Sequence, residues 1–282
     1  MFDFRYHALS LVAVFLALAI GILLGATIGN SLVSDADKGL RSSLHQDVVN
    51  ARNAASQAQS QLSQRDKIIS SALPMLVQGE LGGQRIAIVA TGGLPSSIES
   101  EVRQTVETAG GAVDSVSVFD VDGQLDSIAK AGGLRGRNPA AVQAFGRRVA
   151  RSIVIGDGVA RRMHKALPDT MRGDYNGAGS IIFYRSPPPD QEDDQDKSLR
   201  EAFENGLSEG LAAQGVQAVG VEEQGTDPSQ IGWYKDHNMS SVDSVDLPGG
   251  QLALVFALTG EKGSFGIKGG SSPLPKLPIG SG

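Results

Sequence analysis

The longest apolar run of this chain lies close to its N-terminus. Residues 8–29, ALSLVAVFLALAIGILLGATIG, include no charged side chain. A helix needs about 20 residues to cross a hydrocarbon core roughly 30 Å thick, whereas the apolar part of a cleaved signal peptide usually has only about 7 to 15. The pattern therefore predicts a leader at residues 1–7 and a retained signal anchor, a single transmembrane helix, at residues 8–30.

Charged residues on the two sides of this helix indicate its orientation. Arg5 precedes the helix, Asp35 and Asp37 follow it, and Lys38 and Arg41 come soon afterwards. Because positive charge is retained on the cytoplasmic side and the leader is short, we expect a cytoplasmic N-terminus and an exported chain beyond the helix. The expected localisation is the cell membrane, with the globular region outside the cytoplasm, in a periplasm or its equivalent.

Three glycines lie about one helical turn apart inside the apolar run. Gly21, Gly25 and Gly29 recur every four residues, so they share a helix face on which the backbone of a second helix can approach closely. Glycine is also common in membrane helices, and such spacings arise by chance. The two alternatives are an association face and a set of glycines without that role.

Residues 34–77 have the pattern of one long helix with a seven-residue repeat. The stretch has no proline before Pro74 and is rich in Ala, Gln, Ser and Arg. Apolar residues seven apart form the seam of a coiled coil. The two seam positions are Val48, Ala55, Leu62, Ile69 and Leu76, and Leu44, Ala51, Ala58 and Ala72. Arg41 and Arg65 interrupt this seam and the alanines bury little area, so we expect pairing weaker than in a leucine zipper. The alternative is a helix that packs back on the globular region.

Alternating strand and helix patterns begin after residue 84. Residues 85–91, RIAIVAT, are typical of a buried strand, and residues 112–119, AVDSVSVF, alternate like a second strand. Between them, Ser96 and Glu99 have the spacing of a capping box, and the helical pattern stops at Gly110. This order predicts an α/β fold with a Rossmann-like, doubly wound and mainly parallel sheet.

Further elements complete a globular domain that we place at residues 84–268. Asn138 and Pro139 begin a helix as cap and first residue, and residues 153–155 either continue it or form a strand. The other expected elements are a strand at 180–184, a helix with Leu199, Phe203, Leu207 and Leu211 on its inner face, a strand at 216–221 and a last strand at 252–258. We expect an acidic, proline-rich loop at residues 186–197 and a disordered proline and glycine tail at 269–282.

Composition and motifs argue against several classes of function. The net charge is -6 and there is no cysteine, so we expect no nucleic-acid partner, no disulfide and no thiolate metal site. The turn Thr91-Gly92-Gly93 follows a predicted strand but has neither the G-x-G-x-x-G spacing nor a Walker lysine. We expect no nucleophile elbow of the G-x-S-x-G type. We therefore expect no enzyme, no catalytic residue and no bound cofactor; the alternative keeps the Thr91 turn as a ligand pocket.

Soft side chains that could bind copper lie in two stretches. Met163, His164 and Met171 form one group, and His237 and Met239 form the other. Imidazole and thioether groups suit copper. The alternative is that the methionines fill gaps in the core and that adjacent side chains such as Met163 and His164 point apart.

Basic residues concentrate at residues 135–172. The run includes Arg137, Arg147, Arg148, Arg151, Arg161, Arg162 and Lys165 against Asp157 and Asp169. It could bind anionic lipid headgroups or wall polymers, or it could face the acidic run formed by Asp190, Glu192, Asp193, Asp194 and Asp196. We expect the second arrangement. We interpret the acidic run as a solvated loop, because it lacks the ligand spacing and the central glycine of an EF-hand.

Both ends of the chain resemble a known family. The opening FDFRYHALSLVAVFLALAIGILLG, the late segment SVDSVDLPGGQLALVFALTG, the motif FGIKGG and the proline-containing tail are similar to the MctB family of copper transport outer membrane proteins. The resemblance implies a single-pass envelope protein linked to copper efflux or copper tolerance. Members also resemble the membrane coiled-coil subunit of a two-protein complex in cell separation. The resemblance supplies no metal-ligand motif that can be transferred residue by residue.

Two hypotheses of function follow. The first is a non-enzymatic, membrane-anchored protein of the cell envelope, which associates with itself or with another membrane coiled-coil protein through its glycine-faced helix and its heptads. The alternative is copper transport or copper tolerance. A barrel pore would need many strands of about 9 to 11 residues with apolar outer faces. The chain has one wholly apolar helix and buried strand patterns instead.

Overall fold

The chain divides into two compact units, Met1–Gln64 and Arg65–Gly282. The computed structural model describes residues 4–189, 191–268 and 272–275, except for the side chains of residues 4, 5, 27–39 and 122. A single helix, α1 (Phe4–Val77), forms the described part of the first unit and continues into the second.

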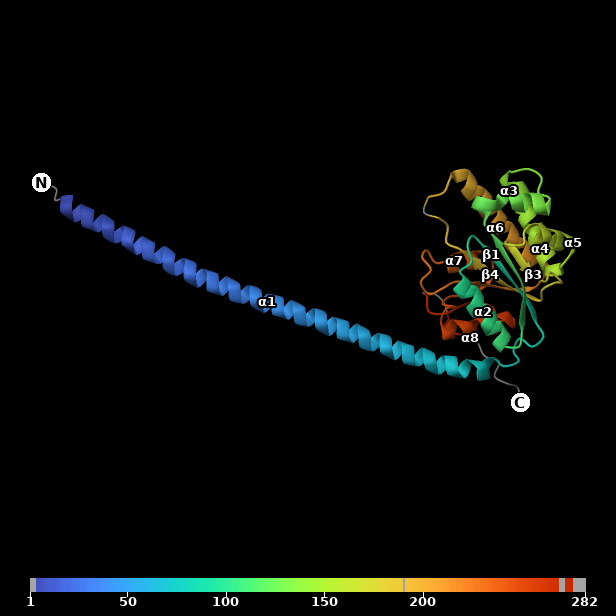
Figure 1. Cartoon of the computed structure of the whole chain (residues 1–282), viewed down its shortest axis with the longest axis horizontal. Coiled ribbons are helices and arrows are strands. Elements are labelled where there is room, and N and C mark those ends of the chain that lie inside the picture. Colours follow the sequence, from blue (N-terminus) through green and yellow to red (C-terminus); the bar gives the residue numbers. More distant parts are fainter. Residues whose placement is uncertain (1–3, 190, 269–271, 276–282) are drawn as a thin grey trace. The chain divides into compact units, whose positions relative to one another are not determined.

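Helix α1 has 74 residues and joins the predicted span and the predicted stalk without a break (Figure 1). Within it, Tyr6–Ala26 has a mean hydropathy of 2.7 and no buried side chain. Among the described residues this is the single helix that is long and apolar enough to cross a membrane. The predicted N-terminal apolar helix is therefore confirmed, and the predicted stalk is helical as far as Val77.

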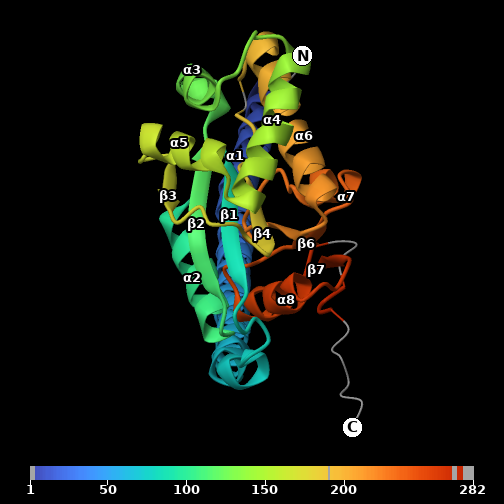
Figure 2. The same ribbon diagram turned by 90° about the vertical axis from the view of Figure 1, so that its right-hand side faces the viewer.

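The second unit contains a seven-stranded sheet with the order β3-β2-β1-β4-β5-β6-β7 (Figure 2). Its strands are β1 (Arg85–Thr91), β2 (Ala112–Phe119), β3 (Met171–Gly173), β4 (Ser180–Arg185), β5 (Gln217–Val221), β6 (Ser240–Val242) and β7 (Ser264–Phe265). Every pairing is parallel except that of β3 with β2. The predicted α/β fold with a mainly parallel sheet is confirmed.

Helices cover both faces of this sheet. They are α2 (Ser96–Thr108), α3 (Val121–Gly132), α4 (Pro139–Ile155), α5 (Gly158–Ala166), α6 (Asp194–Gln214), α7 (Ile231–Asp236) and α8 (Pro248–Leu258). Helices α2 and α8 lie on one side of the strands, and α4, α5 and α6 lie on the other (Figure 1). The winding reverses between β1 and β4, since β2 follows β1 toward one edge and β4 to β6 follow toward the other.

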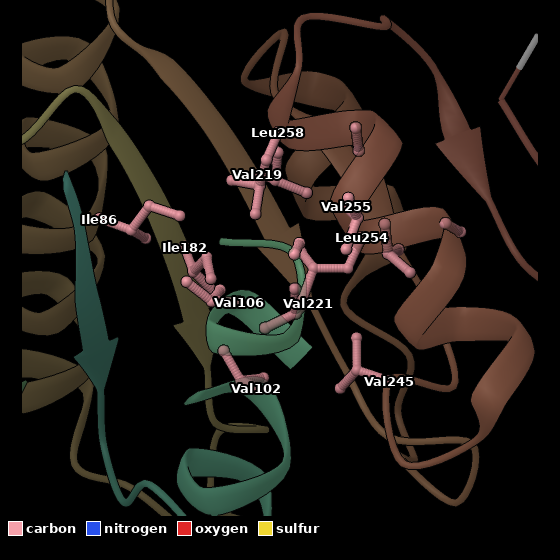
Figure 3. Packing of buried hydrophobic residues seen from close by; sticks show 14 of the residues in the cluster. Ile86, Val102, Val106, Ile182, Val219, Val221, Val245, Leu254, Val255 and Leu258 are labelled. Atoms are coloured by element: carbon pink, nitrogen blue, oxygen red, sulfur yellow. The ribbon is translucent and has the colours of Figure 1, made fainter. Parts of the chain in front are cut away.

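Alternation along each strand produces two hydrophobic cores. Ile86 and Ile88 of β1 pack with α2 and α8, whereas Ala87 and Val89 pack with α4 and α6. Figure 3 shows the first core, in which Val106 of α2 lies close to the side chains of the central strands. Strands buried on both faces have nearly continuous apolar sequences, as predicted for residues 85–91.

Glycines allow α4 and α6 to pack unusually closely. A Cβ atom on Gly206 of α6 would lie 2.1 Å from the carbonyl oxygen of Gln143 in α4. On the facing helix, a Cβ atom on Gly146 would lie 2.5 Å from the carbonyl oxygen of Phe203. No side chain larger than hydrogen fits at either position unless the two helices move apart.

Local signals at helix ends are confirmed in part. Asn138 caps α4 by accepting a hydrogen bond from the amide of Ala141 at 2.9 Å, and Pro139 is the first helical residue. The expected capping box at Ser96 and Glu99 does not form, because the residue before α2 is Pro95 and no side chain caps the helix.

The predicted last strand at residues 252–258 is wrong, because these residues belong to helix α8. All seven side chains are buried. A short helix that is apolar on every side has the same sequence pattern as a strand buried on both faces, so periodicity alone cannot separate them. Pro248 at the start of α8 was the available signal, since proline favours the first turn of a helix.

The structure also refines the expected boundaries or conformation of three other segments. Residues 153–155 continue α4, which settles the alternative left open by the sequence. The expected loop at residues 186–197 ends earlier, because Asp193 caps α6 and Asp194 begins it. Of the expected disordered tail, the structure describes residues 272–275, in which the amide of Ser272 donates to the carbonyl of Ser264 at 2.9 Å; residues 269–271 and 276–282 lie outside the described chain.

Candidate functional site

The heptad stripe of α1 is exposed where the sequence predicts a seam. Leu44 is 55 % exposed, Val48 is 48 % exposed and Leu62 is 58 % exposed. Ala51, Ala55 and Ala58 between them are exposed as well. Large apolar side chains on a helix that has no partner indicate a surface that another chain can cover.

The end of α1 belongs to the globular unit. Leu73 and Val77 are buried in the core that also contains Leu81. Ile69 is half-buried, while Leu76 remains 50 % exposed. The alternative of a helix packed back on the domain therefore applies to the last turns of α1.

Two further exposed apolar residues, outside the predicted seam positions, extend the stripe. Ile68 is 70 % exposed and Met75 is 77 % exposed. Both lie one residue before a seam position, so they widen the stripe on the side away from Leu73 and Val77. The signal that could have found them is the same seven-residue spacing, shifted by one residue.

The glycine face and the heptad stripe are rotated by roughly a third of a turn from each other around α1, at roughly 3.6 residues per turn. Gly21 and Gly25 are exposed, and a Cβ atom on either would meet nothing within 4 Å. Gly21 and Val48 are 27 residues apart, which is about seven and a half turns, whereas Gly25 and Leu44 are 19 residues apart, which is about five and a quarter turns. Gly29 lies outside the residues whose side chains are described. The expectation that glycines and heptads belong to one association surface stays a prediction.

The carboxyl ends of β1 and β4 form the position at which doubly wound folds bind ligands. Thr91 ends β1 and is paired in register with Arg185, which ends β4. Arg185 is buried, and its Nε donates to Glu204 at 2.9 Å. Its guanidinium also donates to the amide oxygen of Gln230, and its backbone N–H donates to the hydroxyl of Tyr234 at 3.0 Å.

A second layer of buried charges surrounds this arginine. Arg200 donates to both carboxylate oxygens of Glu192 at 2.7 Å each and to Glu204 at 3.2 Å. Glu222 accepts from Lys268 Nζ at 2.5 Å. The buried charges at the position where nucleotide folds hold a ligand therefore pair with one another.

Carboxylates make the other face of this sheet edge negative. Burial raises the pKa of Glu101, and the carboxylates of Asp246 and Glu223 raise it further. Burial also raises the pKa of Tyr184 to about 12, with a contribution from Glu223 and Glu222.

The Thr91-Gly92-Gly93 turn has a structural role. Gly92 has a φ of 76°, and a Cβ atom there would lie 2.7 Å from Cβ of Ser186. The hydroxyl oxygen of Thr91 has no hydrogen-bond partner among the described residues. The turn brings the end of β1 close to the loop after β4, which leaves little room for a ligand between them.

The expectation that the chain has no G-x-S-x-G spacing is wrong. Residues 206–210, G-L-S-E-G, have the spacing of a nucleophile elbow. They lie inside α6, where Ser208 is buried, and not at a strand-to-helix turn. The geometry that exposes a nucleophilic serine is therefore missing at Ser208.

The first group of copper-ligand candidates lies beside the β3 edge of the sheet. Met163 and Met171 are fully buried in the core. His164 donates from Nδ1 to the carbonyl of Met171 at 2.6 Å, and its ring lies 5.5 Å from that of Tyr175. The structure thus brings this group together, but the two thioethers serve as core side chains.

The second group lies toward the other edge of the sheet. His237 stacks on Trp233 with ring centroids 3.9 Å apart, and Met239 is buried beside β6. Strands β2, β1, β4 and β5 separate β3 from β6, a distance of roughly 24 Å at about 4.8 Å per strand. The two groups do not meet, and the described residues include no group of three or more His, Asp or Glu suited to a metal ion.

The basic run and the acidic run find partners separately. Arg137 pairs with Asp126 at 3.2 Å, and Arg147 pairs with Glu209 at 2.6 Å. Glu192 of the acidic run pairs with Arg200 of its own segment. The expectation that the acidic run complements the basic run is not supported by these ion pairs. Asp190 lies outside the described residues.

The two late segments used for the family resemblance meet in the fold. Both oxygens of the Asp243 carboxylate accept backbone hydrogen bonds, from Ile267 and from Lys268, at 2.8 Å each. A Cβ atom on Gly266 would lie 2.0 Å from this carboxylate, so the F-G-I-K sequence needs its glycine. The segments have a structural role in joining β6 to the chain after β7.

Comparison with known proteins gives a family for the chain. A family model described as "Copper transport outer membrane protein, MctB" matches residues 1–161. The chain belongs to the MctB family. The matched range contains α1, the first two strands and helices α2 to α4, while the late segments lie beyond it.

Other comparisons add little to the MctB assignment. No curated protein matches the chain. Among solved structures, the chain is similar to aspartate transcarbamoylase from Trypanosoma cruzi in complex with N-(phosphonacetyl)-L-aspartic acid, with 13 % identity over 64 % of this chain and 77 % of that one. The TM-score is 0.15, so no argument rests on this likeness.

Proposed function

We propose that this MctB-family protein is a non-enzymatic structural protein of the cell envelope, anchored by one membrane span with its N-terminus in the cytoplasm. The proposal rests mainly on α1, in which the apolar span Tyr6–Ala26 and the exposed heptad stripe belong to one continuous helix. In the proposed role, α1 associates laterally with a membrane partner. The α/β unit is held outside the cytoplasm.

Two features of the α/β unit support this proposal. The ligand position between β1 and β4 holds the buried ion pair of Arg185 and Glu204, which favours a scaffold over a catalyst. Helices cover both faces of the sheet, so the sheet has no broad apolar surface of the kind that faces lipid in a barrel pore.

Photocrosslinking in native membranes tests lateral association. A photoreactive residue at Leu62, on the stripe, should give a crosslinked product, whereas the same residue at Ser60 on the outer side of the helix should give little. A chain that stays monomeric at both positions and co-purifies with no membrane protein would refute the proposal.

Reporter fusions test the orientation. A periplasmic or surface reporter placed after Gly282 should be active, and a cytoplasmic reporter at the same place should be silent. The opposite result would place the α/β unit in the cytoplasm and overturn an envelope role.

Copper handling is the second candidate, and it rests on the family description. Calorimetric titration of the purified full chain with Cu(I) and Cu(II) tests direct binding, with His164→Ala and His237→Ala as variants. Because the two candidate groups lie toward opposite edges of the sheet, binding at one should be lost in one variant and kept in the other. No heat of binding with either ion would reject direct transport by these residues.

A further inference from the structure

Opposite charges flank the heptad stripe at a spacing that indicates which partner covers it. Asp47 lies just before the seam residue Val48, and Arg52 lies just after the seam residue Ala51. In heptad terms these are the g and e positions. In a parallel, two-stranded coiled coil, the g residue of one helix faces the e residue five positions further along the other helix.

Asp47 and Arg52 cannot satisfy each other within one helix. Side chains three or four residues apart are neighbours on a helix, whereas side chains five apart point in different directions. Neither residue forms an ion pair within the part of the chain that the structure describes. Each charge is exposed beside the apolar stripe.

A second copy of the same helix would pair these charges twice. Asp47 of one copy would face Arg52 of the other, and the symmetric pair would form on the opposite side of the seam. Arg65 in the seam would pack beside Asp66 of the other copy, because a side chain at this seam position contacts the following e position across the interface. The two Arg65 side chains in the seam would then each lie beside an acidic side chain of the other helix.

The membrane span fixes the direction of such a pair. Two copies that enter one membrane through Tyr6–Ala26 run parallel and begin at the same depth. Parallel and in-register pairing is therefore the arrangement that both the span and the charge spacing favour.

We infer that the stripe at residues 44–65 is covered by a second copy of this chain, paired in parallel and in register, with the contacts of Asp47 to Arg52 fixing the register. This inference deepens the proposed function and rests on it. The small residues Ala51, Ala55 and Ala58 allow close approach but bury little area, so the charge pairs should contribute a substantial part of the specificity.

Single cysteines in the otherwise cysteine-free full chain test the geometry. In native membranes, Val48→Cys and Leu62→Cys should each crosslink to the same position of a second copy with a short bismaleimide. Ser60→Cys, on the outer side of the same turn, should not. An antiparallel pair would give no such products at Val48 and Leu62 and would overturn the inference.

Charge reversal tests the pairing. With the Leu62→Cys crosslink as readout, Arg52→Asp should weaken dimerisation by about five- to thirtyfold, since two attractive pairs become repulsive. The double variant Asp47→Arg with Arg52→Asp should restore it, and Lys67→Asp on the outer side should have little effect. A double variant as weak as the single one, or an equal loss for Lys67→Asp, would overturn the inference.

The remaining outcomes separate the two proposals. If Leu62→Cys crosslinks only to a different membrane protein, the inference fails and lateral association stands. If it crosslinks to nothing and Leu62 also fails in photocrosslinking, both fail.

Discussion

Arg185 and Glu204 form an ion pair at 2.9 Å with side chains that are only 8 % and 2 % exposed. The same carboxylate accepts from Arg200 at 3.2 Å. Two guanidinium groups thus share one buried carboxylate at the point where the winding of the sheet reverses.

Removing the shared charge should destabilise the α/β unit strongly. Glu204→Gln keeps the shape of the side chain but leaves two buried guanidiniums without their common counter-charge, so the free energy of unfolding should fall by about 3 to 5 kcal/mol. Urea unfolding, followed by the fluorescence of the single tryptophan, Trp233, measures this. Glu209→Gln, which breaks an exposed pair with Arg147, is the control and should cost less than about 1 kcal/mol. Similar losses in the free energy of unfolding for both variants would show that burial does not make the Glu204 ion pairs more important than the exposed one.

The close crossing of α4 and α6 should not tolerate a methyl group. Gly206→Ala would place Cβ 2.1 Å from a backbone oxygen of α4, and such overpacking costs about 1 to 3 kcal/mol. Gly232→Ala in α7 is a matched control, because its Cβ would meet nothing within 4 Å. It should be neutral or slightly stabilising, since alanine favours a helix over glycine by up to about 1 kcal/mol. The same unfolding assay compares them, and a Gly206→Ala protein as stable as the parent would show that the helices can separate freely.

Glu101 should make stability depend on pH below neutrality. Because the pKa of Glu101 is raised in the folded state, mainly by burial and then by Asp246 and Glu223, the folded state holds the proton more tightly than the unfolded state. The contribution of this group therefore favours folding below its ordinary pKa near 4.5 and is lost as pH rises through the folded value. The free energy of unfolding of Glu101→Gln, measured at a series of pH values, should lack this pH-dependent contribution, which the parent protein retains. An unchanged difference between the two proteins from pH 4 to pH 7 would contradict it.

Arg65 should weaken the proposed helix pairing while Arg52 supports it. Arg65→Leu replaces a charge in the seam with an apolar residue, so dimerisation should become roughly tenfold tighter. Arg52→Leu, beside the seam, should loosen it by removing two ion pairs. The yield of the Leu62→Cys crosslink at several expression levels reports both changes. Changes of the same sign in both variants would contradict the assigned heptad positions.

Strong local patterns made much of the fold predictable from sequence. The apolar span, β1 with its β-branched run, and α4 with its Asn138 cap were each indicated by a signal within one continuous stretch of sequence. Strand β3 has three residues and β7 has two, and their pairing depends on partners far away in the chain. Strands this short have no hydrophobic periodicity that the sequence could reveal. Helix α8 was missed for a different reason, since burial on every side erases the polar face that marks a helix.

The surface of α1 was easier to predict than the interior of the α/β unit. Exposed residues such as Val48 and Leu62 repeat at a seven-residue interval, so the interval alone identifies them. The contact between Arg185 and Glu204 joins β4 to α6 and has no local signal, because charged residues usually occupy surfaces. The separation of the copper-ligand candidates likewise became visible only from the order of the strands.

The rotation of roughly a third of a turn between the glycines and the heptads has a consequence for valency. Two copies joined along residues 44–65 would leave both glycine faces pointing outward, one on each flank of the pair. Each pair would then carry two equivalent contact sites in the plane of the membrane. A molecule with two such sites can link into rows, whose length grows with the local density of copies and not only with the strength of each contact.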